Sequence, residues 1–327
     1  MKRLLALLLI SVLMIAAAGC TTSKQSAAPE TVSFKAAALK GPTAVGMVKM
    51  MDSNPSMGEK VKVDYVIEPS PDTLTAKLLT GEIEFATIPT NSAAILYNKG
   101  VAYKLVAMNT WGVMYVVSSD PAIKTWADLK GKSIDAATKG SAGDVVFRYL
   151  LSKNGIDPAK DVSLQYITSP VEQAQLAIAG KSTISVLPEP WVSTVLSKNP
   201  NLKVALDLQQ EWKRINGADV QFAQTCLVVE TAFAQKYPQI VDKFLQEYAA
   251  SIDWVNKNPA DAGALVGKKD LGIPADVAAG AIPRCNIRYM SAMDAKPAVD
   301  KYLQVLLDFS PNTVGGKLPD ANFFYQK

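Results

Sequence analysis

An internal repeat with a period of 99 residues constrains the fold of this chain more than any other feature. Glycines, prolines and two dipeptides recur at this spacing: Lys40–Gly41 with Lys139–Gly140, Ser70–Pro71 with Ser169–Pro170, Gly81 with Gly180, and Pro89 with Pro188. The match runs without a gap from 37–104 against 136–203. Because glycine and proline fix where strands end and helices begin, matches at these residue types indicate a structural duplication rather than coincidence.

Each half of the repeat alternates short apolar runs with amphipathic stretches of helical length. This alternation predicts an α/β fold with largely parallel sheets. In open α/β sheets, ligands bind outside the carboxyl ends of the strands. We therefore expect two similar lobes, joined by crossover strands near 108–117 and 222–229, with a ligand cleft between them.

The loops at these strand ends supply the candidate ligand-binding residues. We expect Thr43 and Ser141 to cap the helices that follow them and so leave backbone N–H groups free for a ligand. The alternative is that both loops only cap helices. The full candidate set is Pro42, Thr43, Thr90, Asn91, Trp111, Ser141, Gly143, Asp144, Glu189 and Trp191.

Glu189 is the strongest of these candidates. It stands between Pro188 and Pro190 and is followed by Trp191, so its carboxylate occupies a rigid, poorly hydrated setting and needs a partner. A ligand with N–H donors or a positive charge would supply that partner. The alternative is a surface glutamate in a proline-rich turn. Trp191 and Trp111 are candidates for ring stacking, and a place in the core is the alternative for each.

Composition narrows the range of chemistry. The chain has no histidine, so it lacks the commonest general base and the most frequent zinc ligand. We expect no enzyme activity, no cofactor and no metal. The net charge of +4 does not suggest a nucleic-acid surface. An extracytoplasmic enzyme that acts on a small heterocycle, with Asp144 or Glu189 as acid or base, remains as the weaker alternative.

The first twenty residues predict export and anchoring. Lys2 and Arg3 precede an apolar run, 4–15, that is too short to span a bilayer, which is typical of a secretory signal. The small residues that end in Cys20 resemble a bacterial lipoprotein box, in which the cysteine is acylated after cleavage. An ordinary signal peptide with an incidental cysteine is the alternative. We expect a signal peptide over 1–19 and a flexible lipid-anchored linker over 20–33.

Cys226 and Cys285 would be the two cysteines left after acylation of Cys20. They are too far apart for a Cys-x-x-Cys metal or redox motif. In an exported protein, two cysteines predict one disulfide, and two separately buried thiols are the alternative.

Four segments carry a family resemblance: Trp126–Lys132, Lys139–Ser141, Pro188–Trp191 and Phe233–Val241. They resemble the nitrate, sulfonate, bicarbonate and thiamine-precursor group of solute-binding proteins of ABC transporters. The resemblance implies a type II periplasmic-binding fold that delivers a small molecule to a membrane permease with a cytoplasmic ATPase. In thiamine-precursor relatives the glutamate of the Glu-Pro pair contacts an aminopyrimidine, and Glu189 matches that position. Nitrate-binding members rely partly on histidine, which is absent here.

These observations lead to a prediction for the whole chain. Lobe 1 would comprise 34–112 and 226–327, and lobe 2 would comprise 113–225. The protein would be a monomeric receptor outside the cytoplasm, held at the membrane by lipid. A lipoprotein that senses its ligand for a receptor kinase is an alternative. The sequence does not decide whether the ligand is an aminopyrimidine, a sulfonate or an aromatic carboxylate. If it is an anion, the candidates to bind it are Arg148, Arg284 and Arg288.

Overall fold

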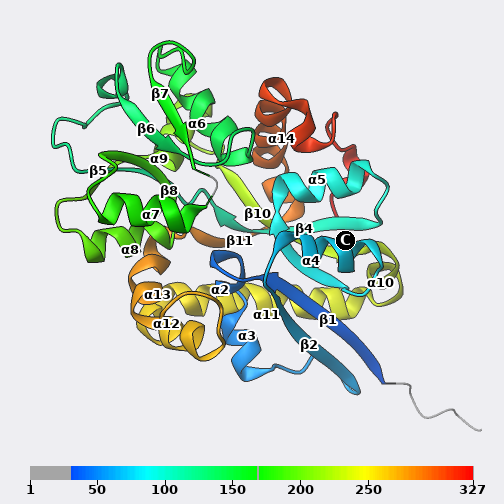
Figure 1. Cartoon of the computed structure of the whole chain (residues 1–327). Helices are drawn as coiled ribbons and strands as arrows, with labels where there is room; N and C mark the ends of the chain where they lie inside the picture. The colour runs from blue at the N-terminus through cyan, green and yellow to red at the C-terminus, as the bar shows by residue number, and fades with distance from the viewer. Residues whose placement is uncertain (1–30, 168, 327) are drawn as a thin grey trace, which may run out of the picture. The chain divides into compact units, whose positions relative to one another are not determined.

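Two mixed β-sheets with helices packed around them make up the computed structural model, which describes residues 31–167 and 169–326 (Figure 1). The signal peptide over 1–19, Cys20 and the linker up to residue 30 lie outside the described residues. The segment from residue 33 onward is one compact unit. None of the described helices combines the length and the hydropathy needed to cross a membrane.

The first sheet has six strands in the order β11-β4-β10-β3-β1-β2, and the second has five in the order β7-β6-β8-β5-β9. The first sheet consists of β1 (Val32–Leu39), β2 (Val61–Glu68), β3 (Phe85–Pro89), β4 (Tyr103–Trp111), β10 (Ala223–Glu230) and β11 (Ile287–Ser291). The second consists of β5 (Met114–Ser118), β6 (Ser133–Ala136), β7 (Ser163–Tyr166), β8 (Ile184–Pro188) and β9 (Lys203–Asp207). We call the six-stranded sheet with its helices lobe 1, and the five-stranded sheet with its helices lobe 2.

The helices follow the same division. Those of lobe 1 are α2 (Pro42–Val45), α3 (Val48–Ser53), α4 (Pro71–Leu79), α5 (Thr90–Asn98), α10 (Thr231–Lys236), α11 (Pro238–Lys257), α12 (Pro259–Lys268), α13 (Ala275–Ala281) and α14 (Ala292–Phe309). Those of lobe 2 are α6 (Ala142–Lys153), α7 (Pro170–Ile178), α8 (Trp191–Lys198) and α9 (Leu208–Asn216). Short 3-10 turns are η1 (Trp126–Leu129), η2 (Ile282–Arg284), η3 (Pro311–Val314) and η4 (Ala321–Phe323).

The 99-residue repeat is present in the fold. Helices α4 and α7 begin and end 99 residues apart, and so do strands β3 and β8. The side chain of Ser70 accepts a hydrogen bond from the backbone N–H of Thr73 at the start of α4, and Ser169 does the same for Glu172 at the start of α7. The predicted pair of similar α/β lobes is confirmed.

The expectation of largely parallel sheets is only partly correct. Parallel pairing joins β1 with β3, and β6 with both β7 and β8. The crossover strands run the other way: β10 is antiparallel to β3 and β4, and β5 is antiparallel to β8 and β9. Strands β5 and β10 are the first strands that the chain forms after it passes from one lobe to the other. Each runs antiparallel to the repeat strand beside it, β8 or β3.

The first crossover is the dipeptide Gly112–Val113, which joins β4 to β5. Gly112 has φ of +48°, in the left-handed region that favours glycine. A Cβ atom there would lie 2.9 Å from Cδ1 of Phe222 and 2.9 Å from Oε1 of Gln209. Residue 112 must therefore be glycine for the two crossover segments to approach this closely.

Aromatic packing forms the core of lobe 1. The rings of Phe85 and Phe244 stack with their centroids 4.1 Å apart, and Phe34 packs against both. In lobe 2, Trp126 packs against Phe147 and is buried, so its role is structural.

The predicted disulfide between Cys226 and Cys285 is wrong: both thiols are free and buried. Cys226 lies in β10, whereas Cys285 ends the turn that leads into β11. Strand β4 lies between β10 and β11. Two interstrand spacings of about 4.8 Å exceed the Cα separation that a disulfide spans, so the sheet keeps the two sulfur atoms apart.

Candidate functional site

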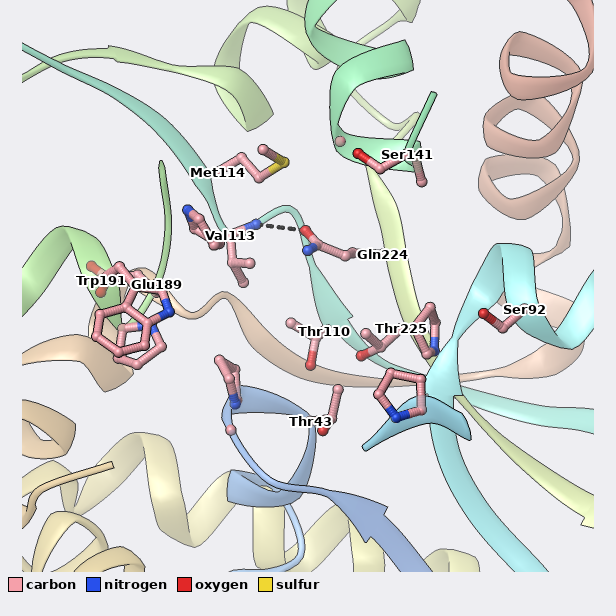
Figure 2. Close-up of a pocket in the computed structure, with 18 of the residues that line it drawn as sticks. Thr43, Ser92, Thr110, Val113, Met114, Ser141, Glu189, Trp191, Gln224 and Thr225 are labelled. Atoms are coloured by element: carbon pink, nitrogen blue, oxygen red, sulfur yellow. Dashed lines mark hydrogen bonds between the residues drawn. The ribbon is translucent and has the colours of Figure 1, made fainter. Parts of the chain in front are cut away.

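A cavity of about 700 Å³ lies where strand ends of both lobes meet the crossover segments (Figure 2). This volume is within the range of small-molecule sites. The lining includes Pro42, Thr43, Asn91, Ser92, Thr110, Val113, Met114, Ser141, Gly143, Glu189, Trp191, Phe222, Gln224 and Thr225. Seven of our ten candidates belong to this lining, and Thr90, Trp111 and Asp144 do not.

The loop after β1 brings Pro42 and Thr43 to the cavity. The prediction that Thr43 caps a helix is wrong, because Gly41 occupies the N-cap position of α2 and Pro42 and Thr43 are already helical. The hydroxyl of Thr43 donates instead to the carbonyl oxygen of Leu39, 2.9 Å away. The N–H of Gly41 donates to the carbonyl of Leu271 at 2.8 Å, which fixes this loop against the C-terminal part of the chain.

The turn after β3 separates two neighbouring candidates. Asn91 lines the cavity, and its Nδ2 donates to the carbonyl of Thr313 at 3.2 Å. Thr90 is fully buried with its hydroxyl 3.9 Å from the sulfur of Met108, so it faces the core of lobe 1.

The loop before α6 is held by Asp144. Ser141 caps the helix as predicted, because its side chain accepts from the backbone N–H of Asp144. The carboxylate of Asp144 is buried and accepts from the N–H of Gly140 at 2.8 Å and from Nε of Arg148 at 3.1 Å. Asp144 therefore positions Ser141 and Gly143 at the cavity and does not itself line it.

Glu189 lines the cavity, but its charge is balanced within the protein. It is 2% exposed, and its carboxylate accepts from the backbone N–H of Ser193 at 3.1 Å and from the Ser193 hydroxyl at 3.0 Å. Nε of Arg284 donates to Oε1 of Glu189 at 2.5 Å. The partner that we expected a ligand to supply is instead an arginine of lobe 1.

The two tryptophan candidates differ in their surroundings. Trp191 stands at the start of α8 with its ring at the cavity (Figure 2). Trp111 is fully buried, donates from Nε1 to the carbonyl of Arg288 at 2.9 Å, and carries the Arg288 guanidinium over its ring at 5.2 Å. Trp111 therefore belongs to the core.

Three polar residues of the crossover strands line the cavity without having been predicted. Thr110 is the penultimate residue of β4, and Gln224 and Thr225 are the second and third residues of β10. The signal was available: each is a polar residue in a strand that is mostly apolar, and a buried polar residue is more informative than a buried apolar one.

The cavity lining carries little charge. Lys40 and Glu189 are its charged side chains, and Nζ of Lys40 lies 2.6 Å from the Asp270 carboxylate. None of the three arginines proposed for an anion is part of the lining. Across the described residues, histidine, cysteine and carboxylate side chains form no group that could hold a metal ion.

Comparison with known proteins identifies the family of this chain. The model of the NMT1-like family matches residues 37–266. A nitrate/nitrite binding protein, NrtA, of Synechococcus elongatus is 27% identical over 206 residues, which cover 62% of this chain and 43% of that protein. The chain thus spans less than half the length of this curated relative.

Two crystal structures share the fold. An ABC transporter structure from Parabacteroides distasonis is 30% identical, with a TM-score of 0.79, and the match covers 91% of this chain and 100% of that one. The periplasmic aliphatic sulphonate binding protein SsuA of Escherichia coli is 20% identical, with a TM-score of 0.72, and the match covers 91% and 93%. These similarities confirm the two-lobed type II periplasmic-binding fold. The family model matches well over half of this chain, and the chain therefore belongs to the NMT1-like family.

Proposed function

We propose that this protein is the solute-binding receptor of an ABC importer and binds a small molecule in the cavity between its lobes. One observation carries the proposal: the cavity of about 700 Å³ is lined by repeat loops of both lobes and by both crossover segments. A ligand at this place contacts both halves of the molecule at once. Its binding energy can therefore favour one arrangement of the lobes over another.

The family and its relatives support a receptor rather than an enzyme. Two of the similar proteins are named for the solutes they bind, and a third is an ABC transporter structure. The receptor would work outside the cytoplasm as a monomer, with a permease and an ATPase as its partners. Lipid attached to Cys20 would hold it beside that permease. The ligand we propose is an aminopyrimidine, a sulfonate or a related compound.

A binding screen tests this function. The purified protein is titrated with a library of small metabolites by thermal shift, and compounds that raise the midpoint are measured by calorimetry. We expect a single class of compound to bind with one molecule per chain. Uptake of that compound into cells that lack the protein should be restored by the wild-type gene. A folded protein that binds none of the library would contradict the proposal.

A further inference from the structure

Arg284 lies outside the cavity lining, but its guanidinium pairs with a carboxylate that belongs to the cavity wall. We infer that Arg284 is a specificity-determining residue: it cancels the negative charge of Glu189 from behind the wall, so that the helix N-termini at the cavity favour an anionic ligand. This inference rests on the proposed function and assigns a sign of charge to its ligand. Without Arg284, the same cavity would disfavour an anion.

Three helices begin at the cavity. Residues from the first turns of α5, α6 and α8 belong to its lining, among them Ser92, Gly143 and Trp191. The N-terminus of a helix carries about half an elementary positive charge and presents backbone N–H groups that have no partner within the helix. Neither α5 nor α8 has an acidic residue in its first turn. The three helix starts therefore make the electrostatic potential in the cavity positive, unless nearby carboxylates cancel it.

Two buried carboxylates lie beside these helix starts. Asp144 belongs to the first turn of α6, and Arg148 pairs with it at 3.1 Å. Glu189 precedes α8 and accepts from the backbone N–H of Ser193 at 3.1 Å. Both carboxylate side chains have an exposed fraction of 0%. Each is therefore sealed from the cavity and acts on a ligand by its charge rather than by contact.

Arg284 neutralises the second of these carboxylates from the other lobe. Its Nε donates to Oε1 of Glu189 at 2.5 Å, and its Nη2 donates to the hydroxyl of Ser193 at 2.6 Å. The backbone carbonyl of Arg284 accepts from the hydroxyl of Tyr115 at 2.8 Å, which fixes the turn that carries it. The pair thus has a defined geometry on both sides, and the charge of Glu189 is balanced where α8 begins.

The other charged side chain of the lining is also paired, because Nζ of Lys40 lies 2.6 Å from the Asp270 carboxylate. With these charges balanced, the helix N-termini determine the sign of the potential, and a carboxylate or sulfonate group is favoured over a cation. Loss of Arg284 would reverse this preference. The unpaired carboxylate of Glu189 would then contribute a full negative charge, which exceeds the partial positive charge of the helix start beside it.

Trp191 makes this charge measurable without any ligand. It is the first residue of α8, and its half-buried ring stands at the cavity close to Glu189 (Figure 2). Iodide, acrylamide and caesium ions quench tryptophan fluorescence by collision and differ in charge, so their relative efficiencies report the local potential. Trp254 is the other tryptophan that is not buried among the described residues, so Trp254→Phe serves as the background.

The test uses the purified full chain at constant ionic strength, with N-acetyltryptophanamide as the reference. We expect iodide to quench Trp191 more efficiently than caesium in the background protein. Arg284→Gln, which keeps a hydrogen-bond donor, and Arg284→Met, which does not, should each lower the iodide quenching constant about 3-fold and raise that of caesium, as expected for one charge near the ring. Acrylamide quenching should not change.

A second substitution separates charge from structure. Adding Glu189→Gln to Arg284→Met removes the unpaired carboxylate and should restore the ratio of iodide to caesium quenching. Both of these variants lack the ion pair between the lobes, so the difference between them measures the charge alone. Arg284→Lys keeps the positive charge and should keep the ratio of the background protein.

Arg214→Met is the matched control. Arg214 pairs with the buried Glu211 at 2.5 Å within α9, and neither residue lines the cavity. Its substitution also leaves a carboxylate without its partner, but at a different place in lobe 2. The quenching of Trp191 should therefore stay the same. A change as large as that in Arg284→Met would contradict a local effect of Arg284.

The outcomes separate this inference from the proposed function. An unchanged ratio in Arg284→Gln and Arg284→Met would overturn the inference, and so would a double variant that behaves like Arg284→Met. A neutral or cationic compound as the ligand found in the metabolite screen would also overturn it and leave the receptor function standing. If the library yields no ligand but quenching changes as expected, the receptor function fails, whereas the control of the cavity charge by Arg284 is supported.

Discussion

Arg284 and Glu189 form an ion pair between the lobes, with Nε and Oε1 2.5 Å apart. Arg284 belongs to turn η2, which leads into β11 of lobe 1, and Glu189 follows β8 of lobe 2. The hydroxyl of Tyr115 in β5 donates to the backbone carbonyl of Arg284 at 2.8 Å, on the same side of the cavity. The edge of the site is therefore braced by contacts that exist only while the lobes keep this arrangement.

Glu189→Gln should weaken both the fold and ligand binding. The carboxylate is fully buried and Arg284 is about one-third exposed, so removing the charge leaves a partly buried guanidinium without its counter-ion. We expect the free energy of unfolding to fall by roughly 1–3 kcal/mol in urea denaturation. Ligand affinity should fall as well, because the arrangement of the lobes is less well defined.

Glu211→Gln is the matched control for this change. Glu211 is also buried and pairs with Arg214 at 2.5 Å, but both residues belong to α9 and neither lines the cavity. Its substitution should lower stability and leave ligand affinity unchanged. If both variants lost affinity equally, the special role of the pair between the lobes would be refuted.

Gly112→Ala should disrupt the crossover. Alanine at φ of +48° is strained, and its methyl group would meet Phe222 and Gln209 at 2.9 Å. Strain and overpacking together should cost about 2–4 kcal/mol of unfolding free energy. Gly131→Ala is the control, because Gly131 has φ of +78° and open space around it, so only the backbone cost of about 1 kcal/mol applies. Equal destabilisation of the two variants would contradict the close packing at the crossover.

The two buried cysteines should be inert in the folded protein. Burial raises the pKa of the Cys226 thiol to about 12 and raises the pKa of Cys285 as well. Since the thiolate is the reactive form, DTNB should label neither residue at neutral pH in a Cys20→Ala variant. After unfolding without reductant, two thiols per chain should react. A count of zero in the unfolded protein would show that they form a disulfide after all.

The proposed anchor is separable from the site. Cys20→Ala should bind ligand in solution with the affinity of the wild type, because the proposed lipid supplies only position. Uptake into cells should fall, since the receptor would no longer be concentrated beside its permease. Calorimetry and transport of radiolabelled ligand measure the two effects independently. Unchanged uptake by cells that carry this variant would argue against a lipid tether.

Local signals in the sequence were enough to predict much of the fold. Ser70–Pro71 and Ser169–Pro170 specify helix starts through a side-chain cap and a proline suited to the first turn, and both helices begin there. The direction of β10 and β5 was not predicted, because it depends on how the chain crosses between the lobes. No pattern of residues within one strand encodes that topology.

The sequence predicted those features of the site that depend on neighbouring residues in the chain, and it missed the contacts between distant residues. The environment of Glu189 correctly indicated that its carboxylate needs a partner, but Arg284 is 95 residues away in the chain. Likewise, the pairing of Thr110 with Thr225 depends on the register between β4 and β10. Thr43 is not the cap because the helix begins at Pro42, two residues earlier than predicted, and the hydroxyl of Thr43 donates to the carbonyl oxygen of Leu39 instead.

Native mass spectrometry of the freshly isolated protein tests the central claim most directly. The cavity is expected to hold one small molecule per chain, which is released by denaturation and identified by its accurate mass. A folded protein that carries no ligand and takes none from a cell extract would contradict the account.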